Sequence, residues 1–299
     1  MILPSPLIRV REELWEKQNI SLWIKRDDLI HPQISGNKFR KLQFLRDLQG
    51  KNLLKGILSF GGAFSNHLHA LAFFCYSEGV PLNVFVRSYD ENPDNPVLSD
   101  LRKWGVQVRI LSPEEYRRKE DPEQIRRWEE EFPGHLILPE GGSHPDALTG
   151  IKDMMQEIGK EGIRADYYFV PVGTGATLAG MVHAQEDPQM TVGISALKTS
   201  ELFYSVQKKW KLEEYRNWTI ADQWHWGGYG KVPEDLKLFL KEFESRHEIL
   251  LDPLYNGKAM YALCQYLQHE LIPPGSVVVF IHTGGLQGWR GIESTMNKE

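Results

Sequence analysis

The sequence has few cysteines, no surplus of positive charge and no long apolar run, and each absence excludes a class of protein. Only Cys75 and Cys264 occur among 299 residues, too few for a disulfide framework, so we expect a reduced environment. Lys and Arg number 35 against 40 Asp and Glu, a net charge of −5, which argues against nucleic-acid binding. No apolar run approaches the ~18 residues of a membrane span.

The beginning of the sequence and its length narrow the class further. The first residues, MILPSPLIRVREELW, lack the basic stretch followed by an apolar run that a secretion signal shows. We therefore expect a cytoplasmic protein with a small-molecule partner. A chain of 299 residues, 41% of them hydrophobic, is long enough for two ordinary domains.

Short apolar strands alternate with amphipathic helices along the chain. The predicted strands are 56–60, 82–87, 106–112, 136–140, 167–173, 191–197 and 276–285. The predicted helices are 66–78, 95–104, 113–131, 146–160, 177–185, 200–211, 233–246 and 257–269, with a further helical segment after Lys38. This alternation predicts an α/β fold with parallel strands and helical crossovers.

Four glycine-containing turns follow predicted strands: SFGGAFSNH, LPEGGSHPDALTG, VPVGTGATLAG and IHTGGLQG. Ligands bind at the carboxyl ends of strands in open α/β sheets, so these turns predict one shared site. The turn VGTGATLAG (172–180) is the strongest phosphate signal, because its glycines, its threonine hydroxyls and a helix start can all contact an anion. Leu178 excludes the dinucleotide fingerprint, and an ordinary turn with Thr177 as helix N-cap is the alternative.

The segment GGAFSNHLHA (61–70) places Ser65, Asn66 and His67 at a second strand end. Ser65 either caps the following helix or binds a ligand there. A metal site is excluded, because His67 and His69 are two residues apart and point to different sides of a helix. We therefore predict no metal.

Two loop tyrosines and one lysine remain as candidates. Tyr255, in DPLYNGKAM, and Tyr229, in WHWGGYGKVP, are either catalytic or packing residues, and the role of 224–226 stays open. Lys38 follows a Gly-Asn turn in SGNKFRKL (35–42). It is either an amine held for imine formation or a solvated lysine in a basic patch.

Taken together, seven motifs in this order resemble one enzyme family: KRDDLI…SGNKFRKL, GGAFSNH, PEGGS, VGTGATLAG, GGYG, DPLYNGKAM and IHTGG. The chain resembles pyridoxal-phosphate enzymes related to tryptophan synthase β (fold type II), and within them the 1-aminocyclopropane-1-carboxylate deaminase and D-cysteine desulfhydrase family. The resemblance implies two three-layer α/β domains with mostly parallel sheets and the site in the cleft between them. The expected domains are a larger one of 1–44 plus 142–299 and an inserted one of 45–141. A homodimer is also expected.

The resemblance also implies the role of each candidate residue, with pyridoxal 5'-phosphate as the cofactor. Lys38 would form the imine with the cofactor and take the α-proton of a small amino-acid substrate. The substrate carboxylate would bind Ser65 and the amides of Asn66 and His67, and Asn66 would also contact the ring hydroxyl. The phosphate would bind Gly173, Thr174, Gly175, Ala176 and Thr177. Tyr255 would lie against the ring, Tyr229 beside the substrate and Thr283 at the pyridine nitrogen.

Two departures from the family pattern bear on the reaction. Ring-opening members typically carry Glu and Leu where this chain has Asn256 and Thr283, which favours β-elimination to pyruvate and ammonia in the manner of D-cysteine desulfhydrase. Ring-opening deamination is the first alternative, and a non-enzymatic nucleotide- or phosphate-binding module is the second. Ser35, His69 and Ala176 are further departures, at positions where the family commonly has Gly, Arg and Gly.

Overall fold

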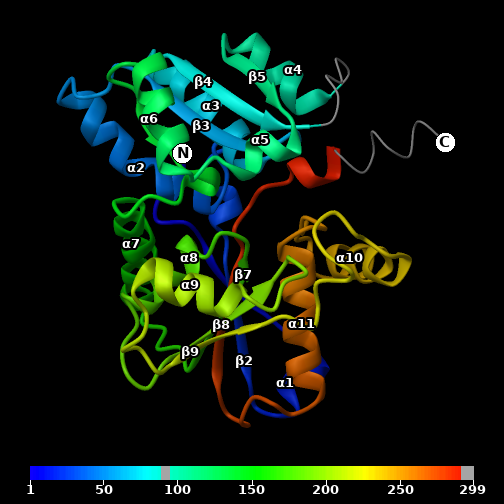
Figure 1. The fold of residues 1–299 in the computed structure, drawn as a ribbon. Helices are drawn as coiled ribbons and strands as arrows, with labels where there is room; N and C mark the ends of the chain where they lie inside the picture. The colour runs from blue at the N-terminus through cyan, green and yellow to red at the C-terminus, as the bar shows by residue number, and fades with distance from the viewer. Residues whose placement is uncertain (89–94, 291–299) are drawn as a thin grey trace. The chain divides into compact units, whose positions relative to one another are not determined.

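The structure is a computed structural model that describes residues 1–88 and 95–290. The chain divides into two compact units, each drawn as part of the ribbon in Figure 1. The larger unit consists of Met1–Arg40 and Leu148–Gly285, and the smaller unit consists of Lys41–Ala147 with the segment that begins at Leu286.

The predicted domains, 1–44 plus 142–299 and 45–141, can be compared with the boundaries of these two units. The units change within a helix at Arg40 and again at Ala147, near the expected boundaries at 44 and 142. The segment from Leu286 goes with the smaller unit rather than with the larger one. The domain assignment itself stays a prediction, and residues 89–94 and 291–299 of its ranges lie outside the described residues.

The larger unit contains a six-stranded sheet in the order β1-β2-β10-β7-β8-β9. Its strands are β1 (Leu7–Val10), β2 (Ser21–Lys25), β7 (Tyr167–Val172), β8 (Met190–Ser195), β9 (Trp218–Ala221) and β10 (Val277–Ile281). β1 pairs antiparallel with β2, and every other pair is parallel. β10 lies between β2 and β7, with Phe280 opposite Ile24 on one side and Phe169 on the other. Its apolar sequence VVVFI fits a strand that is covered on both faces.

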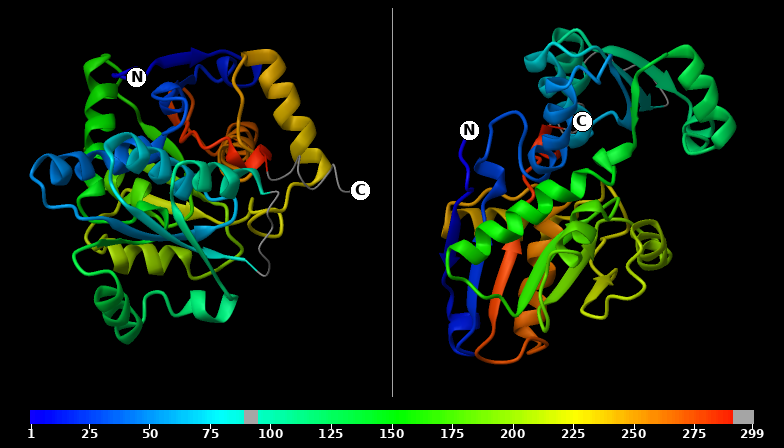
Figure 2. Two further views of the ribbon diagram at one scale, coloured as in Figure 1. Left: turned by 90° about the horizontal axis from the view of Figure 1, so that it is seen from above. Right: turned by 90° about the vertical axis from the view of Figure 1, so that its left-hand side faces the viewer.

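Helices cover both faces of this sheet, as Figures 1 and 2 show. The helices are α1 (Glu13–Glu16), α7 (Ala147–Lys160), α8 (Ala176–Val182), α9 (Leu202–Trp210), α10 (Glu234–His247) and α11 (Asn256–Gln268), with the short 3-10 helix η1 (Asp27–Leu29). Tyr168, Val170 and Val172 of β7 join a core with α7, α8 and α9. Phe169, which points to the opposite face, packs against Tyr266 of α11 with ring centroids 5.3 Å apart. The alternation along β7 therefore makes three layers.

The smaller unit contains a four-stranded parallel sheet in the order β5-β4-β3-β6. Its elements are β3 (Ile57–Gly62), α3 (Asn66–Glu78), β4 (Leu82–Arg87), α4 (Pro96–Lys103), β5 (Gln107–Leu111), α5 (Pro113–Arg117), α6 (Pro122–Glu131), β6 (Leu136–Leu138) and the 3-10 helix η2 (Glu140–Gly142). α2 (Asn37–Gly50) begins in the larger unit and continues into this one. Leu58, Phe60 and Phe85 form a core with Tyr116 and Trp128 of α5 and α6.

The predicted α/β class with mostly parallel sheets is confirmed. The prediction of one helix over 113–131 is wrong, because Asp121 caps a new helix with Pro122 in its first turn. A proline fits that first turn, where its missing N–H has no intrahelical partner. The strands β1, β2 and β9 and the helix α1 were not predicted.

Within residues 1–88 and 95–290, no helix combines the length and the apolar character that crossing a membrane requires. The same residues contain no group of three or more His, Cys, Asp or Glu side chains arranged to bind a metal ion.

Candidate active site

Lys38 lies in the first turn of α2, directly after a tight backbone contact. Gly36 has φ +64°, and a Cβ added there would lie 1.8 Å from the carbonyl oxygen of Thr283. The N–H of Asn37 donates to that same oxygen at 3.1 Å. Only glycine fits such an approach and such a φ without strain. The Gly-Asn turn therefore fixes the start of α2, and with it Lys38, against the end of β10.

The Lys38 amine is partly buried, and burial lowers its pKa from 10.5 to about 8. The carboxylate of Asp252 opposes this shift, because a nearby negative charge favours the ammonium form. Lys38 has no hydrogen-bond partner among the described side chains and backbone groups. A lysine with a pKa of about 8 carries an appreciable neutral fraction near neutral pH, as a nucleophilic amine must.

The predicted phosphate turn, residues 173–177, connects β7 to α8. Gly175 is the N-cap of α8 with φ +82°, so the alternative in which Thr177 is the N-cap is wrong. A Cβ at Gly175 would lie 2.5 Å from a methyl of Val206, so α9 packs directly against the turn. The Thr177 hydroxyl accepts a hydrogen bond from the Asn37 side chain at 2.8 Å, which leaves its own proton to donate. This bond ties the phosphate turn to the residue next to Lys38.

The two tyrosines lie together in the larger unit. A Cβ added at Gly173 would be 3.2 Å from Cε1 of Tyr255, so the Tyr255 ring lies against the start of the phosphate turn. The ring of Tyr229 is 5.6 Å from that of Tyr255, tilted by 58°. Tyr229 is 42% exposed, so its exposed side can face a ligand.

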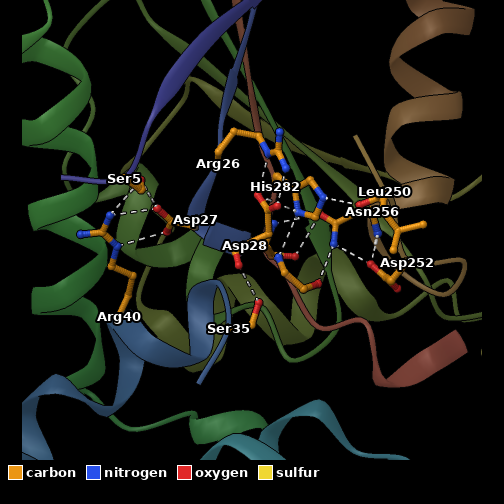
Figure 3. Close-up of polar contacts among 12 residues, drawn as sticks. Ser5, Arg26, Asp27, Asp28, Ser35, Arg40, Leu250, Asp252, Asn256 and His282 are labelled. Atoms are coloured by element: carbon orange, nitrogen blue, oxygen red, sulfur yellow. Dashed lines mark hydrogen bonds and ion pairs between the residues drawn. The ribbon is translucent and has the colours of Figure 1, made fainter. Parts of the chain in front are cut away.

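Thr283 belongs to a buried network with Asn256 and Asp252, part of which Figure 3 shows. The Asn256 amide nitrogen donates to Asp252 at 2.5 Å and to the Gly284 carbonyl at 2.9 Å. Its oxygen therefore faces Thr283 and accepts from both the N–H (2.9 Å) and the hydroxyl (3.2 Å) of that residue. Asp252 also accepts the backbone N–H groups of residues 254–256. Burial nevertheless raises the pKa of Asp252.

A second buried group consists of His282, Asp28 and Arg26 and contacts the turn that carries Thr283 (Figure 3). His282 accepts the Gly284 N–H at Nδ1 (3.1 Å), so its proton lies on Nε2 and is donated to the Leu250 carbonyl (2.9 Å). Asp28 lies 3.6 Å from His282 Nδ1 and forms a two-point ion pair with Arg26. These contacts fix the turn that carries Thr283.

Arg40, two residues after Lys38, anchors the start of α2 in a buried ion-pair cluster. Its guanidinium binds Asp27 at 2.9 Å and Glu157 at 2.6 Å, and Lys25 binds Glu157 at 2.7 Å. The Ser5 hydroxyl donates to Asp27 at 2.6 Å. Every charge in this cluster has an opposite partner, which is what burial requires.

Ser65, Asn66 and His67 lie in the smaller unit, at the turn between β3 and α3. Ser65 caps α3 by accepting the Leu68 N–H, which leaves its hydroxyl proton to donate elsewhere. The Asn66 side-chain oxygen is buried and has no hydrogen-bond partner in the described part of the chain. His67 points into the unit: Ser59 donates to the Leu138 carbonyl and so accepts from His67 Nε2 at 2.8 Å. The N–H of His67 lies in the first turn of α3, where backbone N–H groups have no partner within the helix.

The structure thus brings the predicted residues together in two groups. The larger unit holds Lys38, residues 173–177, Tyr229, Tyr255 and Thr283, and the smaller unit holds the turn 65–67. Sequence reasoning missed Asn37, Asp252, Lys258 and His282. The Asp-Pro pair at 252–253 signals a turn whose carboxylate can accept backbone N–H groups. Lys258 has no such signal, because a lysine in a helix usually faces water.

Comparisons with known proteins agree on one kind of relative. The family model described as pyridoxal-phosphate dependent enzyme matches residues 1–284. A Thermotoga maritima protein, provisionally named 1-aminocyclopropane-1-carboxylate deaminase, is 30% identical over 95% of this chain and 95% of its own. The D-cysteine desulfhydrase of Klebsiella pneumoniae is 27% identical over 94% of this chain and 92% of its own. A crystal structure of an ACC deaminase homologue shares the fold, with a TM-score of 0.81 at 24% identity over 98% of this chain and 93% of that one.

Proposed function

Because the chain belongs to the family of pyridoxal-phosphate dependent enzymes, we propose that it is a lyase that eliminates the β-substituent of a small amino acid, with D-cysteine as the expected substrate. The products would be pyruvate, ammonia and sulfide. The similarity to a D-cysteine desulfhydrase supports this substrate. The observation that carries the proposal is the partly buried amine of Lys38, with its pKa lowered to about 8, one residue from a side chain that binds the phosphate turn.

The residues of the larger unit fit pyridoxal phosphate. When bound, this cofactor supplies an aldehyde for a lysine amine and an electron sink for the bond that breaks at Cα. Lys38 offers the amine, the turn 173–177 offers backbone N–H groups and the Thr177 hydroxyl to the phosphate, and Tyr255 offers a ring face beside that turn. In the smaller unit, the unpartnered oxygen of Asn66 is an acceptor that matches the hydroxyl of the cofactor ring.

The same residues can bind the substrate and move its proton. Lys38, with a pKa of about 8, suits a base that takes the α-proton near neutral pH. The Ser65 hydroxyl, which accepts from the backbone of α3, keeps its proton for the substrate carboxylate. We assign the amides of Asn66 and His67 to the same carboxylate, and Tyr229 to the substrate side of Tyr255.

The buried pair Asn256 and Thr283 favours β-elimination over ring opening. Asn256 cannot ionise, and its amide is held by Asp252, Gly284 and Thr283. The site therefore lacks the carboxylate that ring-opening members of the family typically carry at position 256. Thr283 presents a hydroxyl instead of an apolar side chain at the position assigned to the pyridine nitrogen.

Ring-opening deamination of 1-aminocyclopropane-1-carboxylate is the alternative, and the name of the Thermotoga relative favours it. The two reactions release different 2-oxoacids: pyruvate from D-cysteine and 2-oxobutanoate from the cyclopropane amino acid. Membership of an enzyme family argues against the non-enzymatic phosphate-binding module.

The test is a substrate screen of the purified protein supplied with pyridoxal phosphate. We expect pyruvate and sulfide from D-cysteine and no 2-oxobutanoate from 1-aminocyclopropane-1-carboxylate. Lys38→Ala should lose both turnover and the visible absorbance of bound cofactor, whereas Lys51→Ala, at an exposed lysine beyond α2, should keep them. Release of 2-oxobutanoate alone would support the alternative reaction. A colourless wild-type protein that turns over no amino acid would overturn the proposal.

We also propose that the protein is a cytoplasmic homodimer, and this part of the proposal is based only on the sequence and its resemblance to the family. Size-exclusion chromatography with light scattering measures the mass directly, and a mass near that of one 34.5 kDa chain would contradict the dimer.

A further inference from the structure

A second lysine of the larger unit is less exposed to solvent than Lys38. Lys258 lies in the first turn of α11 and is 0% exposed. Its amine donates to the carbonyls of His225 at 3.0 Å and of Gly228 at 2.9 Å. Burial disfavours the ammonium, and so does the positive end of the helix dipole. A buried amine needs hydrogen-bond partners, and the two carbonyls provide them.

The carbonyls that Lys258 binds belong to a loop with an unusual backbone, residues 224–230. Trp226 has φ +57°, and Gly227, Gly228 and Gly230 have φ +89°, +122° and +82°. A positive φ strains a bulky residue such as Trp226, so the loop needs contacts that hold it. The Trp226 ring packs edge-on against Tyr261 of α11, with ring centroids 5.0 Å apart, but its buried N–H has no hydrogen-bond partner among the described residues.

The loop has hydrogen bonds of its own, and the Lys231 N–H donates to the Gly228 carbonyl at 3.3 Å. The N–H groups of Gly227 and Gly228 donate to the side chain and the carbonyl of His225, at 2.9 and 3.0 Å. The Lys258 amine joins the two carbonyls at the ends of this short turn, and burial makes such bonds stronger than they are in water. Asp252 supplies the opposing charge, which raises the pKa of Lys258 against the lowering effect of burial.

The residue that follows this turn is Tyr229, assigned to the substrate side of the site. A continuous series of contacts leads from the Lys258 amine to Gly228, from Tyr229 to the Tyr255 ring, and from Tyr255 to Gly173 of the phosphate turn. We propose that Lys258 is a positioning residue that holds the loop 224–230 and thereby keeps Tyr229 beside Tyr255. The part of this inference that concerns substrate binding rests on the function proposed above.

The first test measures the loop without any substrate. Trypsin cleaves after lysine, and Lys231 is exposed at the end of the loop. In Lys258→Met, which keeps the length and removes the donor, cleavage after Lys231 should be about tenfold faster or more, because two charge-assisted hydrogen bonds are lost. Mass spectrometry identifies the fragment. Lys241→Met, at an exposed position of α10, is the control and should leave the rate unchanged.

The second test separates positioning from general stability. Lys258→Met should raise KM for the amino acid about tenfold while the visible spectrum of bound cofactor stays that of the wild type. Tyr229→Ala should raise KM similarly, and the double variant should add nothing further, because both changes remove the same contact. If Lys258 only stabilised the fold, the effects of the two substitutions on KM would add, and the visible absorbance of bound cofactor would be weaker in Lys258→Met. If Lys258→Met does not fold, Lys258→Gln, which has amide donors but no charge, takes its place in both tests.

Each outcome has one meaning. Unchanged cleavage after Lys231 in the Lys258 variant overturns the inference whatever the enzyme does. Additive effects on KM overturn the assignment of Lys258 to Tyr229. An absence of turnover in the wild type, together with faster cleavage in the variant, refutes the proposed function and leaves the role of Lys258 in the loop supported.

Discussion

Substituting Gly36 by alanine should damage both the stability of the larger unit and its binding of the cofactor. Gly36 has φ +64°, which costs an alanine about 1–2 kcal/mol. Its new Cβ would also lie 1.8 Å from the Thr283 oxygen and 2.6 Å from the Gly284 nitrogen. These are backbone atoms, which cannot rotate away as a side chain can. Overpacking of this kind adds about 1–3 kcal/mol, so the total cost is about 2–5 kcal/mol.

A second glycine of the same unit separates the two contributions. Gly162 has φ +75° but no atom within 4 Å of the position of an added Cβ. Gly162→Ala should therefore cost only the strain of its backbone, about 1–2 kcal/mol. The difference between the two variants isolates the close approach of the Gly36 turn to Thr283.

The assay is urea denaturation of both variants, with the visible absorbance of bound pyridoxal phosphate measured at a fixed cofactor concentration. Gly36→Ala should unfold at lower urea than Gly162→Ala and should bind less cofactor, because relieving the clash moves either the Lys38 turn or Thr283. Equal unfolding midpoints in the two variants, with normal cofactor binding in both, would refute the reasoning.

Three further predictions follow from the same unit. Arg40→Met should lower the free energy of unfolding by about 3–5 kcal/mol, because buried carboxylates lose their counter-charge, and an unchanged urea midpoint would contradict this. Cofactor uptake by the apoprotein should accelerate with pH up to about 8 and then level off, because the protonated Lys38 amine below its pKa does not react, and Asp252→Asn should lower this midpoint. Stopped-flow absorbance measures the uptake rate of the wild type and of the variant at each pH. A wild-type rate that reaches half of its maximum only at pH 10.5 would disprove the pKa shift of Lys38. Asn37→Ala should raise the Kd for pyridoxal phosphate roughly threefold to tenfold, since it frees Thr177, whereas an unchanged Kd in equilibrium dialysis would count against that contact.

The features that depend on local sequence were predicted well. β4 was predicted without error at 82–87, and β7 and β8 within one or two residues, because short apolar runs between turn signals suffice to mark buried parallel strands. The family resemblance is confirmed by the match over residues 1–284. It could be recognised from the sequence because each motif consists of a few adjacent residues at a turn. The roles of the individual site residues stay predictions.

The features that depend on distant contacts were not predicted. β2 carries a charged Lys25 that a strand pattern disfavours, and its partners, Glu157 on α7 and the Ser5 carbonyl, make that burial possible. The split of 113–131 was missed because the charge pattern runs through Asp121 and Pro122, which together restart a helix. Lys258 looks like a surface residue until the carbonyls of His225 and Gly228 are placed around it.

The position of β10 in the sheet has a consequence for synthesis of the chain on the ribosome. β2 is complete after Lys25, but its parallel partner begins only at Val277, so the antiparallel β1–β2 pair emerges some 250 residues before the strand that covers its edge. The sheet of the smaller unit, formed between Ile57 and Leu138, can assemble meanwhile. Until β10 has been synthesised, the nascent β1–β2 pair therefore exposes a strand edge of the kind that favours aggregation and that chaperones protect.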